Sequence, residues 1–141
     1  MVTEKPFAAM QVAADDRILE VNCGHGEVAR RLAALAANGL VVGIDKSDEA
    51  VREARRQSAS IDNVMFAIGA PEEIPWKENY FSLVLCNAPV EDWKRAVAEV
   101  FRVTAPGGRG CFPQAPPEAE AGLRDAGFEV RGRLPLEGRK P

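Results

Sequence analysis

Short apolar runs alternate along the chain with stretches in which apolar residues recur at intervals of three and four. The runs contain almost no polar alternation, so they predict strands that are buried on both faces. They cover 17–21, 40–44, 63–68, 81–86, 108–112 and 128–131. The stretches between them have the period of amphipathic helices. This alternation predicts an α/β fold with a doubly wound, mostly parallel sheet of about six strands flanked by helices.

The first predicted helix covers 27–37. Val28, Leu32 and Leu35 recur at helical spacing and are expected to face the sheet. Gly39 follows the last periodic residue, so it is expected to end the helix in the left-handed conformation. This helix begins directly after a glycine-rich turn.

Turn residues mark the ends of the other predicted helices. Ser47 is expected to cap the second helix, which fades near Ser60. The clearest amphipathic pattern covers 92–103, and the Pro-Gly-Gly sequence at 106–108 is expected to form a turn before the fifth strand. A short last helix is expected to stop at Gly127.

The 141 residues predict one domain over 1–141, with an N-terminal arm at 1–15 and a C-terminal tail at 134–141. A formal net charge of −3 argues against non-specific binding to nucleic acid, because such binding needs a basic face. The arginine pairs at 30–31 and 55–56 fall on predicted helices and are interpreted as solvated faces.

No apolar run reaches the roughly 18 residues of a membrane span, and the first residues lack the basic start and apolar stretch of a signal peptide. We therefore expect a cytoplasmic protein without a membrane segment. Three cysteines, Cys23, Cys86 and Cys111, are odd in number and lack metal-ligand spacing. We expect no metal site, and reduced thiols that pack at strand ends.

The segment Leu19 to Ala29 joins an apolar strand to a helix through a turn that contains Gly24 and Gly26. Glycine lets a backbone turn sharply and lets a ligand approach without meeting a Cβ, and the following helix presents free N–H groups. The spacing fits the dinucleotide fingerprint, so a dinucleotide oxidoreductase is one interpretation. Glu20 favours a different ligand, because a carboxylate suits an ammonium group and repels a pyrophosphate.

Four collinear segments resemble class I S-adenosylmethionine-dependent methyltransferases, in particular the small-molecule branch that includes the ubiquinone and menaquinone biosynthesis enzymes. They are the acidic glycine-rich motif at 20–26, the second strand with its terminal acid at 41–47, the loop and fourth strand at 70–85, and the helix with its Pro-Gly-Gly turn at 90–110. The resemblance implies a Rossmann-like fold, S-adenosylmethionine as cofactor and methyl transfer to a small-molecule acceptor.

The resemblance also implies that the cofactor binds at the carboxyl ends of the strands. Asp45, at the tip of the second strand, is expected to accept both hydroxyls of the ribose, and a plain acid at a helix entry is the alternative. Glu20 is expected to serve the ammonium of the methionine part, with backbone groups near Asn22 and Asn87 beside it. From the methionine part to the purine, the expected cofactor residues are Glu20, Asn22, Cys23, Gly24, Gly26, Asn87, Asp45, Lys46, Gly69 and Ala70.

Three residues depart from the pattern of the resembling family. Asn22 stands where glycine is usual, and asparagine tolerates a left-handed φ, although its side chain occupies space near the ligand. Ala70 stands where an acid commonly recognises the adenine amino group, a role for which Glu72 or Glu73 is a substitute on the same loop. Ser82 replaces an aspartate at the fourth strand.

No catalytic residue is assigned. His25, the only histidine, is a weak candidate for a general base in the glycine turn, and shaping the entrance is the alternative. Residues 87–90 resemble the Asn-Pro-Pro-aromatic signature of amino-group methyltransferases, but the second proline and the aromatic residue are displaced or missing. Trp76, on the loop 72–80, is expected to belong either to a mobile wall or to a packing anchor.

The chain has few residues before its first strand, and its final strand is expected to be absent or rudimentary, so most of the family's lid is missing. The fifth or sixth strand would then form an exposed edge, which predicts a homodimer or a complex with a partner subunit. The missing lid and the three departures support a second interpretation. In that interpretation the chain is a catalytically inactive methyltransferase-like binding or interaction module.

Overall fold

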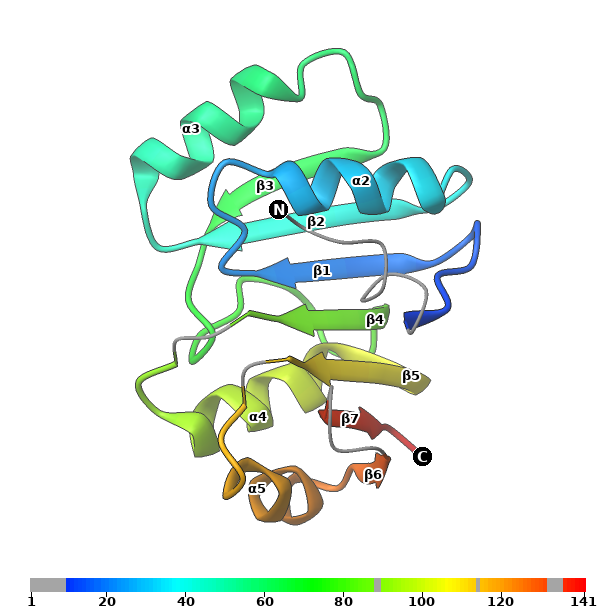
Figure 1. The fold of residues 1–141 in the computed structure, drawn as a ribbon, viewed down its shortest axis with the longest axis vertical. Helices are drawn as coiled ribbons and strands as arrows, with labels where there is room; N and C mark the ends of the chain where they lie inside the picture. Colours follow the sequence, from blue (N-terminus) through cyan, green and yellow to red (C-terminus); the bar gives the residue numbers. More distant parts are fainter. Residues whose placement is uncertain (1–9, 88–89, 114, 132–135) are drawn as a thin grey trace.

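The computed structural model of this chain describes residues 10–87, 90–113, 115–131 and 136–141. The strands of this part form one sheet in the order β3-β2-β1-β4-β5-β7-β6 (Figure 1). Strands β1 to β5 pair in parallel, and β7 pairs antiparallel with β5 and β6. The expected mostly parallel sheet is confirmed. The strands are β1 (Arg17–Val21), β2 (Leu40–Asp45), β3 (Val64–Ile68), β4 (Phe81–Cys86), β5 (Thr104–Phe112), β6 (Glu129–Arg131) and β7 (Leu136–Arg139).

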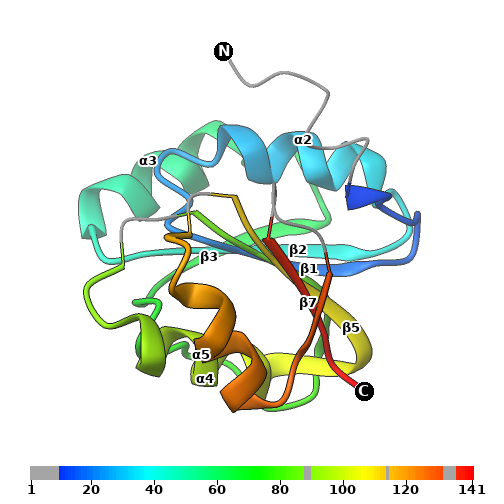
Figure 2. The same cartoon turned by 60° about the horizontal axis from the view of Figure 1, so that its bottom comes forward.

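The helices α2 and α3 cover one face of the sheet, and α4 and α5 cover the other (Figure 2). The chain winds outward from β1 through β2 to β3 and then returns to β4 on the other side of β1. Strands β1, β2 and β4 therefore end together where the direction of winding changes, which is where ligands bind in folds of this architecture. The helices are α2 (Glu27–Leu35), α3 (Asp48–Gln57), α4 (Trp93–Val103) and α5 (Ala119–Ala126).

Two apolar layers hold the helices on the sheet. Ile18 and Leu32 belong to the layer under α2 and α3, whereas Leu19 and Val100 belong to the layer under α4 and α5. Neighbouring residues of β1 thus point into opposite layers, and neither Ile18 nor Leu19 has any exposed surface. The apolar runs of the sequence reflect this burial on both faces.

The first helix is shorter than predicted, and one of its expected inward residues is exposed. It ends at Leu35, and this leucine is 47% exposed, so its expected inward position is wrong. The expected inward position of Leu32 is confirmed, and Ala29 and Ala33 are buried beside it. Gly39 does not adopt the left-handed conformation. A Cβ at Gly39 would lie 2.0 Å from the carbonyl oxygen of Asp16, so close packing between backbones requires this glycine.

The predicted C-terminal tail at 134–141 contains a strand. Its first two residues lie outside the described part, but Leu136–Arg139 form β7 between β5 and β6. A Cβ on Gly138 would lie 2.7 Å from Cγ of Phe128, so this strand packs closely on the core. The final strand is therefore present but has only four residues, so the expectation that it is absent is wrong. Because β7 pairs with β5, β5 is not an edge, whereas β6 is one, as the alternative expectation has it. A four-residue strand that contains glycine carries too little alternation to be recognised in the sequence.

The Pro-Gly-Gly sequence at 106–108 lies within β5 rather than before it. Gly107 has a φ of 82°, and the pairing between β4 and β5 shifts register beside this segment. The predicted helix signals at Ser47 and Gly127 are confirmed. Ser47 Oγ accepts a hydrogen bond from the Ala50 amide at 3.1 Å, and Gly127 ends α5 with a φ of 113°.

Candidate functional site

The glycine turn after β1 lies at the edge where β1, β2 and β4 end. Asn22, Gly24 and Gly26 have positive φ values of 63°, 56° and 87°. Asn22 therefore takes the left-handed conformation that asparagine tolerates better than most residues. Gly26 directly precedes α2, so the N-terminus of this helix lies at the same edge. Its free N–H groups make this edge suited to polar and anionic groups of a ligand.

The two glycines of the turn serve different purposes. A Cβ on Gly24 would have no heavy atom within 4 Å, whereas a Cβ on Gly26 would lie 2.7 Å from Cζ of Phe66. Gly26 is therefore required by packing against β3 as well as by its φ. Gly24 leaves open space at the edge of the sheet, as expected where a ligand approaches the backbone.

Asp45 holds the glycine turn from the neighbouring strand. Its Oδ2 accepts a hydrogen bond from the Gly24 amide at 2.9 Å, and its Oδ1 accepts one from the Ser47 amide at 3.0 Å. The side chain is thus a helix-entry acid, which was the alternative interpretation, and it also reaches the ligand turn. Each carboxylate oxygen has a second lone pair, so these contacts leave capacity for a ribose hydroxyl.

Glu20 is a buried acid at the end of β1. The residue is 2% exposed, and its Oε2 accepts a hydrogen bond from Asn87 Nδ2 at 3.1 Å. Its Oε1 is buried without a hydrogen-bond partner in the described part of the chain. Burial raises the pKa of this carboxyl to about 8, against the lowering effects of the Asn87 side chain and, to a smaller degree, of the Ala29 backbone amide in the first turn of α2. The carboxyl is therefore mostly neutral at pH 7 until a cation approaches it.

Asn22 and Asn87 join the ends of β1 and β4. Asn22 Nδ2 donates to the carbonyl oxygen of Asn87 at 2.5 Å, and the Asn87 amide donates to the Val21 carbonyl at 3.3 Å. Ala88 and Pro89 lie outside the described residues. The alternative interpretation of 87–90 as an amino-group methyltransferase signature therefore stays a prediction.

These side chains surround a pocket of about 480 Å³. Five of the expected cofactor residues line it, namely Glu20, Asn22, Cys23, Gly24 and Asn87. His25, Glu27 and Val28 complete the lining. Glu27 and Val28 belong to the first turn of α2 and were missed as site residues, although their position directly after the glycine turn was a usable signal.

Of the other expected residues, Gly26 lies at the start of α2, and Asp45, Lys46, Gly69 and Ala70 lie along the tips of β2 and β3. The Gly69 amide donates to the Asp45 carbonyl at 3.0 Å, which places the end of β3 beside Asp45. A Cβ on Gly69 would lie 2.6 Å from Cδ of Pro75. Lys46 is exposed and pairs with Glu91 at 3.9 Å. Asp45 thus connects the pocket to the strand tips where the purine is expected.

The loop that follows β3 offers one acid in place of the missing one at Ala70. Glu72 is held elsewhere, since its carboxylate accepts hydrogen bonds from the amides of Glu91 and Asp92, both at 3.1 Å. Glu73 is exposed, and its backbone pairs with Ala70. Of the two acids proposed as substitutes, Glu73 is the one whose carboxylate is not engaged in capping the start of α4.

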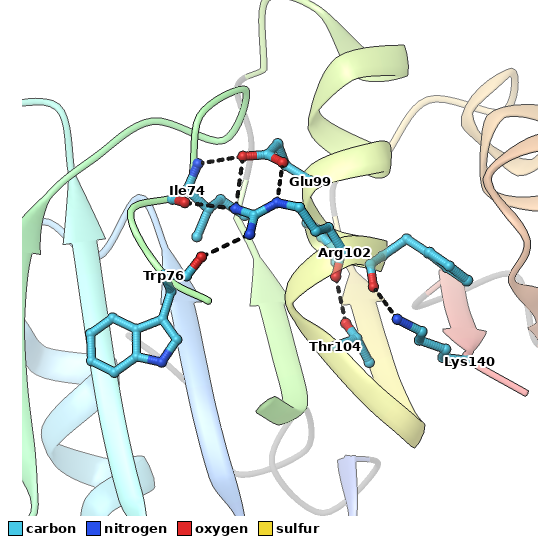
Figure 3. A network of polar contacts seen from close by, with 8 residues as sticks. Ile74, Trp76, Glu99, Arg102, Thr104 and Lys140 are labelled. Carbon is cyan, nitrogen blue, oxygen red and sulfur yellow. Dashed lines mark hydrogen bonds and ion pairs between the residues drawn. The ribbon is translucent and has the colours of Figure 1, made fainter. Parts of the chain in front are cut away.

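The connection from β3 to β4 is fastened to α4 (Figure 3). Arg102 donates to the carbonyl oxygens of Ile74 and Trp76 at 2.9 and 2.8 Å. Glu99 accepts from Arg102 Nε at 2.6 Å and from the Ile74 amide at 2.9 Å. The Trp76 ring packs 5.6 Å from that of Phe81, centroid to centroid. These contacts favour the interpretation of Trp76 as a packing anchor over that of a mobile wall.

Ser82 lies away from the pocket, at the amino end of β4. Its Oγ accepts a hydrogen bond from the Arg17 amide at 2.9 Å and donates to Asp16 Oδ1 at 2.7 Å. The hydroxyl therefore fastens the beginning of β4 to the beginning of β1. The departure from the family pattern at this position has no direct contact with the cofactor site.

His25 is exposed at the rim of the pocket. Its backbone carbonyl accepts a hydrogen bond from Arg30 Nη1 at 2.8 Å, and the same nitrogen lies 3.1 Å from Ser58 Oγ. Arg30 thus anchors the glycine turn to the end of α3 and is not merely part of a solvated face. The imidazole lies at the entrance of the pocket, a position that suits both a general base and a residue that shapes the entrance.

None of the thiols in the described part of the chain is activated as a nucleophile by its surroundings. Cys23, Cys86 and Cys111 are free and buried, and burial raises the pKa of each thiol to about 12. Such thiols pack as small apolar groups. No group of three or more potential metal ligands occurs in the described part. None of its helices has the length and apolarity needed to cross a membrane.

Fold, glycine turn and strand-end acids together define a class I S-adenosylmethionine-dependent methyltransferase domain. A family model described as methyltransferase domain matches residues 18–108. The chain belongs to this family. Membership identifies S-adenosylmethionine as the cofactor and removes the dinucleotide oxidoreductase interpretation.

Two relatives illustrate the similarity in sequence. An uncharacterized methyltransferase of Schizosaccharomyces pombe is 30% identical over 145 residues, which covers 89% of this chain and 51% of the relative. A demethylmenaquinone methyltransferase of Staphylococcus aureus is 34% identical over 105 residues, which covers 70% of this chain and 43% of the relative. The chain thus spans about half the length of these relatives.

Solved structures share the fold. An S-adenosylmethionine-dependent methyltransferase from Aquifex aeolicus superposes with a TM-score of 0.80 at 20% identity, covering 96% of this chain and 87% of that one. A complex of the Haloferax volcanii Trm112 methyltransferase activator with a putative methyltransferase gives a TM-score of 0.81 at 20% identity, covering 92% of this chain and 68% of that one.

The residues present fit S-adenosylmethionine. Oε1 of Glu20 is a buried acceptor without a partner among the described residues, as expected for a site that receives an ammonium group. Gly24 leaves space for a ligand against the turn. Asp45 retains acceptor capacity for hydroxyl groups beside that turn.

Proposed function

We propose that this chain transfers the methyl group of S-adenosylmethionine to a small-molecule acceptor. The observation that carries the proposal is the unpartnered Oε1 of Glu20, buried in a pocket beside the open Gly24 turn. A buried acid of this kind costs stability unless a ligand satisfies it. The family match supports the same cofactor independently.

The protein's part in the reaction is binding and alignment. The cofactor, when bound, supplies a methyl group that its sulfonium has already activated. Glu20 would hold the ammonium, Asp45 the ribose hydroxyls, and the strand tips at Gly69 and Ala70 the purine. These contacts orient the cofactor, and alignment of an acceptor beside it supplies much of the rate enhancement for such a transfer.

A small-molecule acceptor fits the charge and the relatives of this chain. The net charge of −3 disfavours a polyanionic substrate such as nucleic acid. The Staphylococcus aureus relative is named for action on demethylmenaquinone, a small molecule. His25, at the rim of the pocket, is a candidate general base for acceptors that carry an ionisable proton.

A catalytically inactive binding module is the second candidate function. The departures at Asn22 and Ala70 favour it, because both lie in the cofactor site. The departure at Ser82 does not, since its hydroxyl serves the pairing of β1 with β4. Both candidates are compatible with cofactor binding, so binding alone does not separate them.

Turnover separates the two candidates. The purified chain is incubated with S-adenosylmethionine labelled in its methyl group and a panel of phenols, quinols, amines and carboxylic acids. The proposed function predicts labelled product and S-adenosylhomocysteine with at least one acceptor class, and at limiting cofactor concentration both should fall by about tenfold in Asp45→Asn. Saturable cofactor binding without transfer to any member of the panel would favour the binding module.

The free edges of the sheet support association with a second chain. In the described sheet the edges are β3 and β6. On β3, Met65 and Ile68 are 44% and 52% exposed. Arg55 covers part of this edge, because its guanidinium donates to the Phe66 carbonyl at 2.9 and 3.2 Å. The complex of a similar fold with an activator supports a separate partner subunit as the alternative to a homodimer.

Light scattering over a range of protein concentrations tests this association. A homodimer predicts a mass of two chains that falls to one chain in Met65→Lys, since a charge at an edge opposes pairing. A single-chain mass at every concentration would eliminate the homodimer and direct the search to a separate partner. We also propose a cytoplasmic location, which the unpaired cysteines support and cell fractionation tests.

A further inference from the structure

Asn22 occupies a position whose backbone conformation a glycine would adopt at least as well. Its φ is 63°, and the resembling family usually has glycine there. The turn alone therefore does not require asparagine. The side chain makes a specific contact instead, because Nδ2 donates to the Asn87 carbonyl at 2.5 Å.

We propose that Asn22 is a positioning residue. It fixes the end of β4 so that the side-chain amide of Asn87 is held on the Glu20 carboxyl. The proposal rests on the proposed cofactor site and concerns how that site is organised. Asn22 need not touch the cofactor for this role, since it acts through Asn87.

The geometry around Asn87 supports this role. The pairing of β1 with β4 ends at Val21 and Cys86, so Asn87 is the first residue beyond the paired strand. Its backbone N–H donates a long hydrogen bond of 3.3 Å to the Val21 carbonyl. Asn22 holds the carbonyl of the same residue from the turn after β1. With both backbone groups of Asn87 held, its side chain is directed to Glu20 Oε2 at 3.1 Å.

The contact matters because Asn87 is the side chain that stabilises the charged form of Glu20. Glu20 is buried, and the other titratable groups that act on it offer no positive charge: Asp45 raises its pKa and Cys23 is a thiol. His25 and Glu27 lie on the same pocket lining. If the Asn87 amide moves away, the carboxyl holds its proton to higher pH and binds an ammonium group less readily.

The test is a calorimetric titration with S-adenosylhomocysteine from pH 6 to pH 9 on wild-type protein and Asn22→Gly. The variant keeps the turn conformation, so its melting temperature should stay within about 2 °C of wild type. Its affinity at pH 7 should fall about tenfold, the effect of one lost hydrogen bond in a buried site. The pH at which affinity levels off should move upward.

Asn79→Gly is the matched control. Asn79 also has a left-handed φ, of 55°, but its side chain accepts a hydrogen bond from Lys140 at the amino end of β4, away from the pocket. The same substitution there should leave both the affinity and its pH profile unchanged. An equal loss in both variants would mean that Asn22 acts only through stability, and it would overturn the proposal.

A double-mutant cycle shows whether Asn22 acts through Asn87. In Asn87→Ala, the further change Asn22→Gly should have little additional effect on affinity, because the amide that it positions is gone. Full additivity, or wild-type affinity and pH profile in Asn22→Gly, would overturn the inference while leaving the proposed function intact. Absence of binding by the wild-type protein would overturn the proposed function and this inference with it.

Discussion

The backbone amide of Gly24 lies 2.9 Å from Oδ2 of Asp45, so the acid at the tip of β2 holds the turn that follows β1. The other oxygen of the same carboxylate accepts from the Ser47 amide at the start of α3. One side chain thus connects the glycine turn to the helix entry without any ligand. Asp45 consequently contributes to stability as well as to the proposed cofactor site.

Replacing Asp45 should therefore destabilise the protein in the absence of cofactor. Two backbone amides lose a charged acceptor at a half-buried position, so Asp45→Ala is expected to lower the free energy of unfolding by about 1–2 kcal/mol. Asp48→Ala is the control, since Asp48 is exposed and pairs with Arg52 on the surface of α3, worth less than about 1 kcal/mol. Urea denaturation measures both. Equal losses would show that the Asp45 contacts contribute nothing specific.

The two glycines of the turn should respond differently to alanine. Gly26→Ala introduces a Cβ 2.7 Å from Phe66 Cζ at a φ of 87°, so we expect a loss of about 2–4 kcal/mol in unfolding free energy. Gly24→Ala meets no atom within 4 Å and should cost only about 1–2 kcal/mol for its left-handed φ. It should nevertheless weaken binding of S-adenosylhomocysteine, because the methyl group occupies the open side of the turn. Unchanged affinity in Gly24→Ala would contradict this division of roles.

Glu20 should make the stability of the ligand-free protein depend on pH. Its pKa is raised by burial from 4.5 to about 8. Its contribution to stability is therefore fully present below pH 4.5 and is lost as the pH rises through 8, since the folded state then carries a buried charge. The Glu20→Gln variant should not lose this stability, because an amide does not ionise. Its advantage over wild type should grow between pH 5 and pH 8 to an amount on the order of 3–5 kcal/mol.

Thermal unfolding at a series of pH values measures the difference between Glu20→Gln and wild type. Titration with S-adenosylhomocysteine is the companion experiment, and it should show weaker binding in the more stable variant, because a neutral amide does not attract an ammonium group. Parallel pH profiles for the two proteins would mean that Glu20 does not titrate in the native protein between pH 5 and pH 8.

Arg102 should be a stability determinant of the connection between β3 and β4. Its guanidinium binds the Ile74 and Trp76 carbonyls and the Glu99 carboxylate, so Arg102→Met should cost about 2–3 kcal/mol. Arg124→Met is the control, because Arg124 pairs with Glu120 on the exposed face of α5 and should cost less than about 0.5 kcal/mol. Chemical denaturation of the two variants distinguishes them. Similar midpoints would mean that the Arg102 contacts do not stabilise the connection between β3 and β4.

Local patterns were sufficient to predict the part of the fold that forms the site. The apolar run of β1, the glycines after it and the acid at the end of β2 each have a local physical meaning. Because parallel strands end at one edge, those segments had to converge there. The resemblance to methyltransferases added the expectation that Glu20, Asn22, Cys23, Gly24 and Asn87 belong to one cofactor site, and these five residues line one pocket.

Features that depend on distant partners were not visible in the sequence. Leu35 looked like an inward residue by its spacing, but α2 ends at this residue and buries Ala29, Leu32 and Ala33. Gly39 is required by the Asp16 backbone rather than by its own φ. Strand β7 is stabilised between two other strands and by the fit of Gly138 against Phe128. Asp16 and β5 lie far along the chain from Gly39 and β7, which they constrain.

A calorimetric titration of the wild-type protein and Asp45→Asn with S-adenosylhomocysteine at pH 8 tests whether the strand-end pocket binds the cofactor. We expect saturable binding of one ligand per chain in wild type and a loss of about tenfold or more in Asp45→Asn, because a charged acceptor of ribose hydroxyls is removed. No binding by the wild-type protein at high ligand concentration, or equal affinity in the two proteins, would contradict a cofactor site built on Glu20, Gly24 and Asp45.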